Sequence, residues 1–162
     1  MFGRAKIFKV IRNYYSKIVS GVKMYTREDL FGILKIISFA GSSFDQRTRL
    51  HKLVCIAKTK PGINYPFSFE FCRYFYGPYS FELRDMTGQL VKDGVVEEKM
   101  VFFCNGNKGF SYNLTEVGKS LLASLESNTE PKNIEKIKTL FEESGGKKRN
   151  ELVDEAKKFF GW

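Results

Sequence analysis

The sequence has few of the residues that most often bind metals or act as nucleophiles. It contains one histidine, His51, in 162 residues, which excludes a metal site built on two histidines. The three cysteines, Cys55, Cys72 and Cys104, are odd in number and far apart, which argues against a disulfide scaffold and against a clustered zinc site. We therefore expect three buried free thiols and no metal or other cofactor.

Long apolar runs and catalytic motifs are also lacking. No apolar run reaches the ~18 residues that span a bilayer, and the N-terminus lacks the continuous apolar segment of a secretory signal. The chain has no phosphate-binding loop, zincin pair or nucleophile elbow. Adjacent acids such as Glu97 and Glu98 point in different directions on a strand or helix, which suits surface charges. We expect a cytoplasmic protein that does not associate with membranes and is not an enzyme.

Hydrophobic and positively charged residues are abundant. Hydrophobic residues make up 43% of the chain and aromatic residues 15%, which favours one folded domain with extensions over a disordered chain. The net charge of +9 would attract phosphates or anionic surfaces. Residues 1–26 carry six basic residues and no acid, whereas residues 59–99 carry six acids and five basic residues. The positive charge is therefore concentrated toward the N-terminus.

Residues 4–23 are predicted to form a basic amphipathic helix. Apolar residues from Ile7 to Val22 share one face at helical spacing. The opposite face carries four candidate DNA-contacting residues: Lys6, Lys9, Arg12 and Lys17. Three interpretations stay open: a helix packed on the core or on a second subunit, an arm that contacts phosphates, and a helix on a membrane surface.

Two further helices are predicted before residue 60. Thr26 and Asp29 form a start that resembles a capping box, and residues 30–40 are apolar nearly all round, which predicts a buried central helix. Residues 41–43 break it, and a second helix covers residues 45–58 before a turn at residues 60–64. The residues of this second helix expected to face outward are Arg47, Arg49, Lys52 and Lys58.

Residues 67–76 alternate aromatic and other side chains, which predicts a strand. We expect this strand to pair with the hairpin that follows the next helix and so to form a three-stranded sheet. Gly77 and Pro78 then form the turn into a third helix, which Ser80 caps and which ends near Asp93 before a left-handed Gly94.

A β-hairpin and another helix follow. Residues 95–104 and 110–114 are rich in Val, Phe and Tyr, and the Asn-Gly pair at residues 105–106 is a strong hairpin signal. Thr115 is predicted to cap the next helix. Three helices, a two-stranded wing and a further helix are the elements of a winged helix.

The motifs in this region resemble those of known proteins. The segment from Tyr112 to Gly118 matches Tyr-x-Leu-Thr-x-x-Gly and precedes paired leucines, as in many winged helix-turn-helix regulators. The preceding segment is similar to a group of small bacterial and archaeal winged-helix proteins with a Lys-Leu pair, an aromatic strand, Tyr-Gly-Pro-Tyr-Ser and a leucine-rich helix ending in glycine. Here these are Lys52-Leu53, residues 67–75, residues 76–80 and Gly94. The resemblance covers residues 27–127 and implies a winged-helix fold. Most members of the group are predicted regulators, and relatives include SocA-like antitoxin domains that bind proteins.

Two helices are predicted after a linker at residues 128–131. They cover residues 131–143 and 148–160, and each carries an apolar stripe. Such stripes suit a dimer seam or a wrap around the core, and we expect a homodimer through the terminal helices. The predicted fold is α+β: a winged helix-turn-helix core (27–127) with a small antiparallel sheet, an N-terminal helix (1–26) and a C-terminal helical extension (128–162).

Two functions are consistent with this fold. The first is a DNA-binding transcriptional regulator that contacts double-stranded DNA through the N-terminal helix and further residues of the core: Arg47, Arg49, Lys52, Ser80, Arg84, Gln89, Lys92, Lys99 and Lys108. The third helix is a poor reading head, because Glu82 and Asp85 lie among its few polar contacts. The second function is therefore a protein-interaction module, with Phe81 and the aromatic strand edge at its contact.

Overall fold

The computed structural model describes residues 3–16, 25–40 and 46–162. The elements of the described residues, in order, are α1 (Gly3–Ser16), α2 (Arg27–Ala40), α3 (Gln46–Thr59), β1 (Cys72–Tyr74), β2 (Gly77–Tyr79), α4 (Phe81–Lys92), β3 (Val96–Phe102), β4 (Lys108–Leu114), α5 (Glu116–Glu126), α6 (Pro131–Leu140), the π-helical turn η1 (Phe141–Gly145) and α7 (Arg149–Phe160). The fold is α+β, as predicted.

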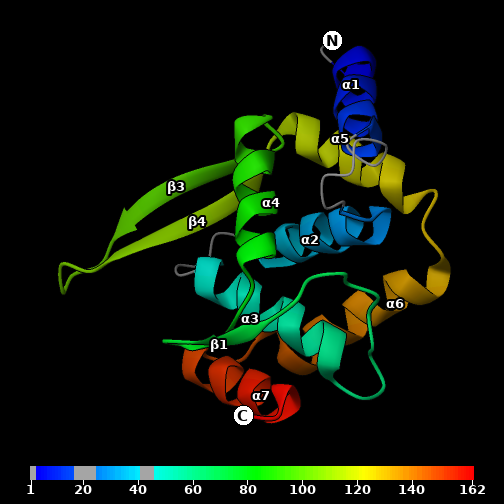
Figure 1. Ribbon diagram of the computed structural model, residues 1–162. Helices are drawn as coiled ribbons and strands as arrows, with labels where there is room; N and C mark the ends of the chain where they lie inside the picture. Colours follow the sequence, from blue (N-terminus) through cyan, green and yellow to red (C-terminus); the bar gives the residue numbers. More distant parts are fainter. Residues whose placement is uncertain (1–2, 17–24, 41–45) are drawn as a thin grey trace.

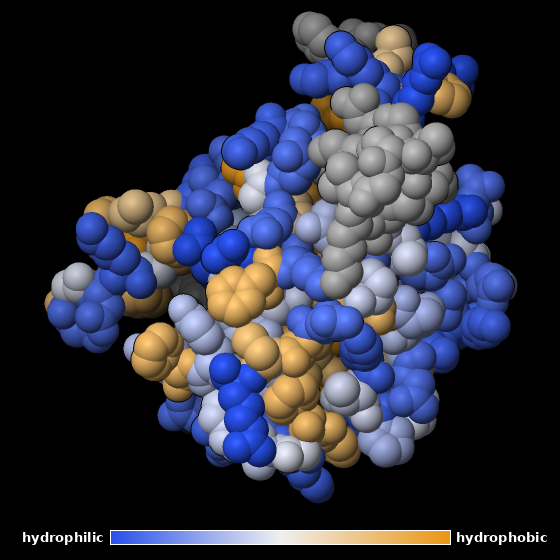
Figure 2. Space-filling model, viewed as in Figure 1, coloured by the Kyte–Doolittle hydropathy of each residue, from blue (hydrophilic) through white to orange (hydrophobic). Residues whose placement is uncertain are grey.

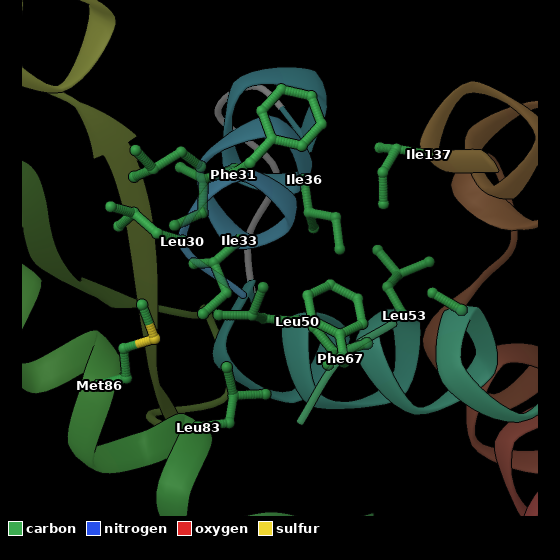
Figure 3. Packing of buried hydrophobic residues seen from close by; sticks show 14 of the residues in the cluster. Leu30, Phe31, Ile33, Ile36, Leu50, Leu53, Phe67, Leu83, Met86 and Ile137 are labelled. Carbon is green, nitrogen blue, oxygen red and sulfur yellow. The ribbon is translucent and has the colours of Figure 1, made fainter. Parts of the chain in front are cut away.

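The core lies between α2, α3, α4 and the helices that close around them (Figure 1). Figure 3 shows Ile33 and Ile36 of α2 pointing toward Leu50 and Leu53 of α3, with Leu83 and Met86 of α4 on one side and Ile137 of α6 on the other. Helix α2 is buried along most of its length, as its uniformly apolar sequence predicted. Burial of each large apolar side chain stabilises the fold by about 1.5–3 kcal/mol.

Thr26 and Asp29 cap α2 reciprocally, which confirms the predicted capping box. The amide of Asp29 donates to Thr26 Oγ1 at 3.0 Å, and the amide of Thr26 donates to Asp29 Oδ2 at 2.8 Å. The Asp29 carboxylate, which is fully buried, also accepts from the amide of Ser68 at 2.8 Å. Asp29 therefore ties the start of α2 to a segment 39 positions later.

The predicted strand over residues 67–76 is wrong for most of its length. Side chains occupy backbone groups that a strand partner would need: Asp29 accepts from Ser68, Lys58 donates to the carbonyl of Phe69, and Glu82 accepts from the amide of Glu70 at 3.2 Å. The alternation is nevertheless real, because Tyr65, Phe67 and Phe69 are buried. A buried alternating segment can thus be held extended largely by side chains, without a strand partner.

The end of that segment forms its own hairpin instead of joining the β3–β4 hairpin, which, with its loop, we call the wing. Strand β1 pairs antiparallel with β2 through a two-residue loop, so Gly77 and Pro78 lie in a strand rather than in the expected turn. Strands β3 and β4 pair only with each other, which replaces the predicted three-stranded sheet by two two-stranded ones. Both hairpins project on the same side of the protein (Figure 1).

The predicted caps of α4 and α5 are confirmed. Ser80 Oγ accepts from the amide of Leu83 at 3.2 Å, and Thr115 Oγ1 accepts from the amide of Gly118 at 3.1 Å. Gly94 follows α4 with a φ of 71°, the left-handed conformation that glycine adopts without strain. The β3–β4 hairpin has the predicted order, with register pairs from Val96↔Leu114 to Phe102↔Lys108.

The C-terminal helices pack on the core of their own chain. Ile137, Leu140 and Leu152 are fully buried. Of the two predicted uses of these apolar stripes, a dimer seam or packing around the core, the structure shows packing around the core. Arg49 of α3 donates to the carbonyls of Gly145 and Lys147 at 2.9 and 2.8 Å, which fixes the loop before α7. Within the described residues, no helix has both the length and the hydrophobicity to cross a bilayer.

Candidate nucleic-acid interface

A cavity of about 640 Å³ lies between the wing and the β1–β2 hairpin. We call it the basic groove. The residues that line it are Arg47 and Thr48 of α3, Tyr76 of the hairpin loop, Arg149 of α7, and Phe103, Asn105, Asn107, Lys108, Gly109 and Phe110 of the wing. Three of these are cations, four carry neutral hydrogen-bonding side chains, and none of these described lining residues is acidic. The first turns of α3 and α7 both reach it.

Arg47 joins the groove to the wing. Its guanidinium donates to Tyr112 Oη at 3.1 Å and to Glu98 Oε2 at 2.9 Å, and it lies 3.8 Å from the centre of the Phe110 ring. The ion pair with Glu98 offsets part of its charge. Arg47 therefore orients the wing relative to α3 in addition to lining the groove.

Arg149 reaches the groove because α7 begins beside α3. The carbonyls bound by Arg49 fix one side of the loop before α7. The nearly buried carboxylate of Glu155 accepts hydrogen bonds from Lys147 at 2.6 Å, from Lys60 at 3.0 Å and from Ser144. These bonds fix the other side of the same loop. This network places the first residue of α7 where its guanidinium lies 5.2 Å from the centre of the Tyr76 ring.

Two consecutive residues of α3 hold the Tyr-Gly-Pro-Tyr-Ser segment. Lys52, only 2% exposed, donates from Nζ to the carbonyl of Pro78 at 2.6 Å. His51 Nδ1 accepts from the amide of Ser80 at 3.3 Å. Gly77 is required beside Lys52, because its φ is 97° and a Cβ there would lie 3.3 Å from Lys52 Cε. The sequence motif is thus explained by its attachment to α3.

Aromatic rings connect this attachment to the surface. The ring of His51 stacks on Tyr79 with centroids 4.1 Å apart and planes at 5°, and Tyr79 stacks on Tyr74 at 4.8 Å. Phe75 meets the edge of Tyr74 at 4.9 Å, and Phe81 packs edge-on against Tyr79 at 5.2 Å. We call Tyr74, Phe75, Tyr76, Tyr79 and Phe81 the aromatic platform.

Burial and the surrounding cations keep the imidazole of His51 neutral at physiological pH. Burial, followed by the nearby cations Lys52, Arg47 and Arg84, lowers the pKa of His51 from 6.5 to about 3. Burial also lowers the pKa of Lys52, to about 8, and the cations Arg149 and Lys157 act in the same direction. At pH 7 Lys52 is therefore protonated, and it is buried.

His51 should make the protein sensitive to acid. Because its folded pKa lies below its unfolded value, the unfolded chain takes up the proton first, and stability is lost as pH falls from 6.5 toward 3. Between pH 6.5 and 4.5, the wild type should lose about 2–3 kcal/mol more unfolding free energy than His51→Gln. Urea denaturation of both proteins at the two pH values measures this, and equal losses in both would contradict it.

On the outward face of α4, two of the predicted DNA-contacting side chains are bound to acids. Arg84 donates to the adjacent Asp85 at 2.8 and 3.0 Å, and Gln89 donates to Asp93 at 3.0 Å, so both are bound to acids. Lys92 is exposed. Arg84 and Lys92 line, together with Arg47, a cleft of about 350 Å³ beside the groove, where Glu98 also lies.

The structure distributes the other predicted DNA-contacting residues over separate surfaces. Lys6, Lys9 and Arg12 are exposed on α1, which lies beside α5, away from the wing tip (Figure 1), and Lys17 lies outside the described residues. Lys99 is exposed on β3, 3.5 Å from Glu97, and Lys108 lines the groove. Lys52 was predicted to face outward, and this is wrong. Ser80 is buried as the cap of α4, and Arg49 binds backbone carbonyls.

Sequence reasoning missed Arg149 and Tyr76 as groove residues. Arg149 follows a Gly-Gly-Lys-Lys run, and that basic turn was the available signal, but its position depends on α7 packing beside α3. Tyr76 was placed in a strand and is instead 66% exposed in a loop. The thiols were also misjudged, because Cys55 is buried whereas Cys72 and Cys104 are exposed.

No group of three His, Cys, Asp or Glu side chains in the described part of the chain is arranged to hold a metal ion. Comparison of the chain with protein-family models, curated proteins and solved structures finds no match.

Proposed function

We propose that this protein is a DNA-binding regulator of the winged-helix type whose main contact is the basic groove rather than α4. The observation that carries this proposal is the set of Arg47, Lys108 and Arg149 around a groove whose described lining residues include no acid. Phosphate contacts in protein–DNA complexes come from Arg and Lys, from Thr and Asn side chains, and from helix N-termini. The groove contains all of these groups.

The wing is the element best placed to follow a DNA backbone. Lys108 and the neighbouring Asn105 and Asn107 lie at its exposed end. On α4, by contrast, Arg84 and Gln89 are bound to Asp85 and Asp93, and freeing them for a base edge would first break those contacts. Binding is therefore expected to depend mainly on phosphates and to have modest sequence preference.

The test is the salt dependence of duplex binding in the double variant Lys108→Ala/Arg149→Ala. Each phosphate contact adds about 0.9 to the slope of log affinity against log salt, so the double variant should lose about 1.8 units of slope. Fluorescence anisotropy with a mixed pool of labelled duplexes over a salt series measures the affinity and its salt slope.

Two matched double variants remove the same charge elsewhere. Lys132→Ala/Lys138→Ala acts on exposed lysines of α6 and should leave the slope unchanged. Lys6→Ala/Lys9→Ala acts on α1 and tests the arm predicted from the sequence. If the slope of log affinity against log salt fell only in the α1 variant, the groove would not be the DNA contact, and the contact would be assigned to the N-terminal helix.

Protein binding is the second candidate, because the aromatic platform is exposed. Phe81 is 44% and Tyr74 41% exposed, and both belong to the same cluster of rings. Absence of any salt-dependent duplex binding at low ionic strength would favour this function over the first. Homodimerisation stays a prediction and now concerns α1, whose Phe8 is exposed, since α6 and α7 pack on their own chain.

A further inference from the structure

The loop of the β1–β2 hairpin exposes two adjacent aromatic side chains. Phe75 is 85% and Tyr76 66% exposed, and hydrophobic residues are visible over the end of this hairpin at the lower left of Figure 2. Two-residue hairpin loops usually carry Gly, Asn or Asp. Large exposed apolar patches commonly mark binding sites. The rings are therefore candidates for contact with a partner.

The hairpin that carries these rings is supported from below. The column His51–Tyr79–Tyr74 runs from a buried residue of α3 to the surface, and Phe75 packs against its outer end. Lys52 and His51 hold the backbone of the same segment through Pro78 and Ser80. These contacts fix the hairpin beneath the two rings, which lowers the conformational entropy lost when a flat ligand stacks on its loop.

One of the two rings, Tyr76, adjoins the cations of the basic groove. Tyr76 lines the groove itself, and Arg149 lies over its ring. Tyr74 and Tyr76 also line a smaller cavity, of about 90 Å³, which shares Arg47 with the groove and reaches Lys52. An exposed aromatic surface next to a positively charged groove is the combination that binds single-stranded nucleic acids, with bases on the rings and phosphates along the cations.

We propose that the basic groove binds nucleotides with unpaired bases, which stack on Phe75 and Tyr76 of the aromatic platform while their phosphates contact Arg47, Lys108 and Arg149. A single strand and a free mononucleotide share this chemistry. A duplex can contact the same cations through its phosphates, but its base faces are covered by their neighbours, so we expect the single strand to bind more tightly. This inference rests on the proposed nucleic-acid binding and specifies the form of nucleic acid that the groove takes.

The experiment compares a labelled 20-nucleotide single strand with a duplex of the same length. Base–aromatic stacking contributes about 1–3 kcal/mol per base, so Phe75→Ala/Tyr76→Ala should weaken single-strand binding by at least about tenfold. The salt slope should stay as in the wild type, because no charge is removed. Phe102→Ala, which removes a similarly exposed ring on β3, is the matched control and should leave the affinity unchanged.

The outcomes separate this inference from the proposed function. Duplex binding that needs Lys108 and Arg149 but is unaffected by Phe75→Ala/Tyr76→Ala, with no tighter binding of the single strand, overturns the inference and leaves the proposed function standing. Absence of binding to either form overturns both and favours protein binding. Competition with a mononucleotide distinguishes the two sources: equal potency per nucleotide assigns the site to a free nucleotide, and weak competition assigns it to a strand.

Discussion

Gly118→Ala is expected to lower the free energy of unfolding by about 2 kcal/mol. A Cβ at residue 118 would lie 2.1 Å from the carbonyl oxygen of Val95, which is backbone and cannot rotate away. Overpacking of this kind costs about 3 kcal/mol, the upper part of its usual range. The better helix propensity of alanine returns only about 1 kcal/mol. Thermal or urea denaturation, monitored by circular dichroism, measures the loss.

The matched control is Gly88→Ala in α4. Gly88 has open space around its Cβ position and, like Gly118, lies in a helix. The same substitution should therefore stabilise the protein by about 0.5–1 kcal/mol. If the Gly118→Ala protein were at least as stable as the wild type, the close contact between the Val95 carbonyl and α5 could widen without loss of stability.

The contact of α5 with the Val95 carbonyl explains the Tyr-x-Leu-Thr-x-x-Gly motif. Thr115 caps α5, its amide donates to the carbonyl of Val95 at 3.1 Å, and its hydroxyl donates to the carbonyl of Gly94 at 2.6 Å. Gly118 lets α5 approach the carbonyl of Val95. Tyr112 receives the hydrogen bond from Arg47 at 3.1 Å. The motif therefore fixes where the wing leaves the core, which is a structural role in the first instance.

Asp29→Ala is expected to destabilise the protein by about 3 kcal/mol. The carboxylate is fully buried and accepts from the amides of Thr26 and Ser68 and from the Ser68 hydroxyl. Hydrogen bonds to a charged group contribute about 1.5–3 kcal/mol, and loss of the carboxylate leaves the two amides without their acceptor. Chemical denaturation measures the change in unfolding free energy.

Two further variants give this prediction its controls. Asp85→Ala removes an exposed acid from α4 and should change stability by less than about 0.5 kcal/mol. Asp29→Asn keeps one oxygen acceptor at the site and should fall between the wild type and alanine. If Asp29→Ala were no more destabilising than Asp85→Ala, the clamp between α2 and Ser68 would not contribute to stability.

Local signals in the sequence were sufficient for most helices and for the wing. The caps at Thr26, Ser80 and Thr115 and the left-handed Gly94 depend on residues within a few positions, and all are as predicted. The predicted strand around Phe67 was wrong because the groups that bind its backbone, Asp29 and Lys58, come from α2 and α3. Alternation indicates which side chains are buried and does not identify what satisfies the backbone.

The site was less accessible to sequence reasoning than the fold. A basic residue on an amphipathic helix was assumed to face solvent, and Lys52 instead spans the core to the carbonyl of Pro78. The concentration of charge at the N-terminus drew attention to α1, whereas the groove takes cations from three distant parts of the chain, Arg47, Lys108 and Arg149. Only the packing of α7 against α3 brings the last of these to the groove.

The wall of the groove that contains Arg149 is held by contacts between distant parts of the chain. Arg49 meets Lys147 across 98 positions of sequence, and Lys60 meets Glu155 across 95. Contacts of such high sequence separation form late, and during synthesis the N-terminal parts of a chain fold first. Leu152 and Ala156 of α7 are fully buried in the core, and Arg149 of the same helix lines the groove. A nascent chain would therefore complete its core and its groove together, only after residues 149–160 have left the ribosome.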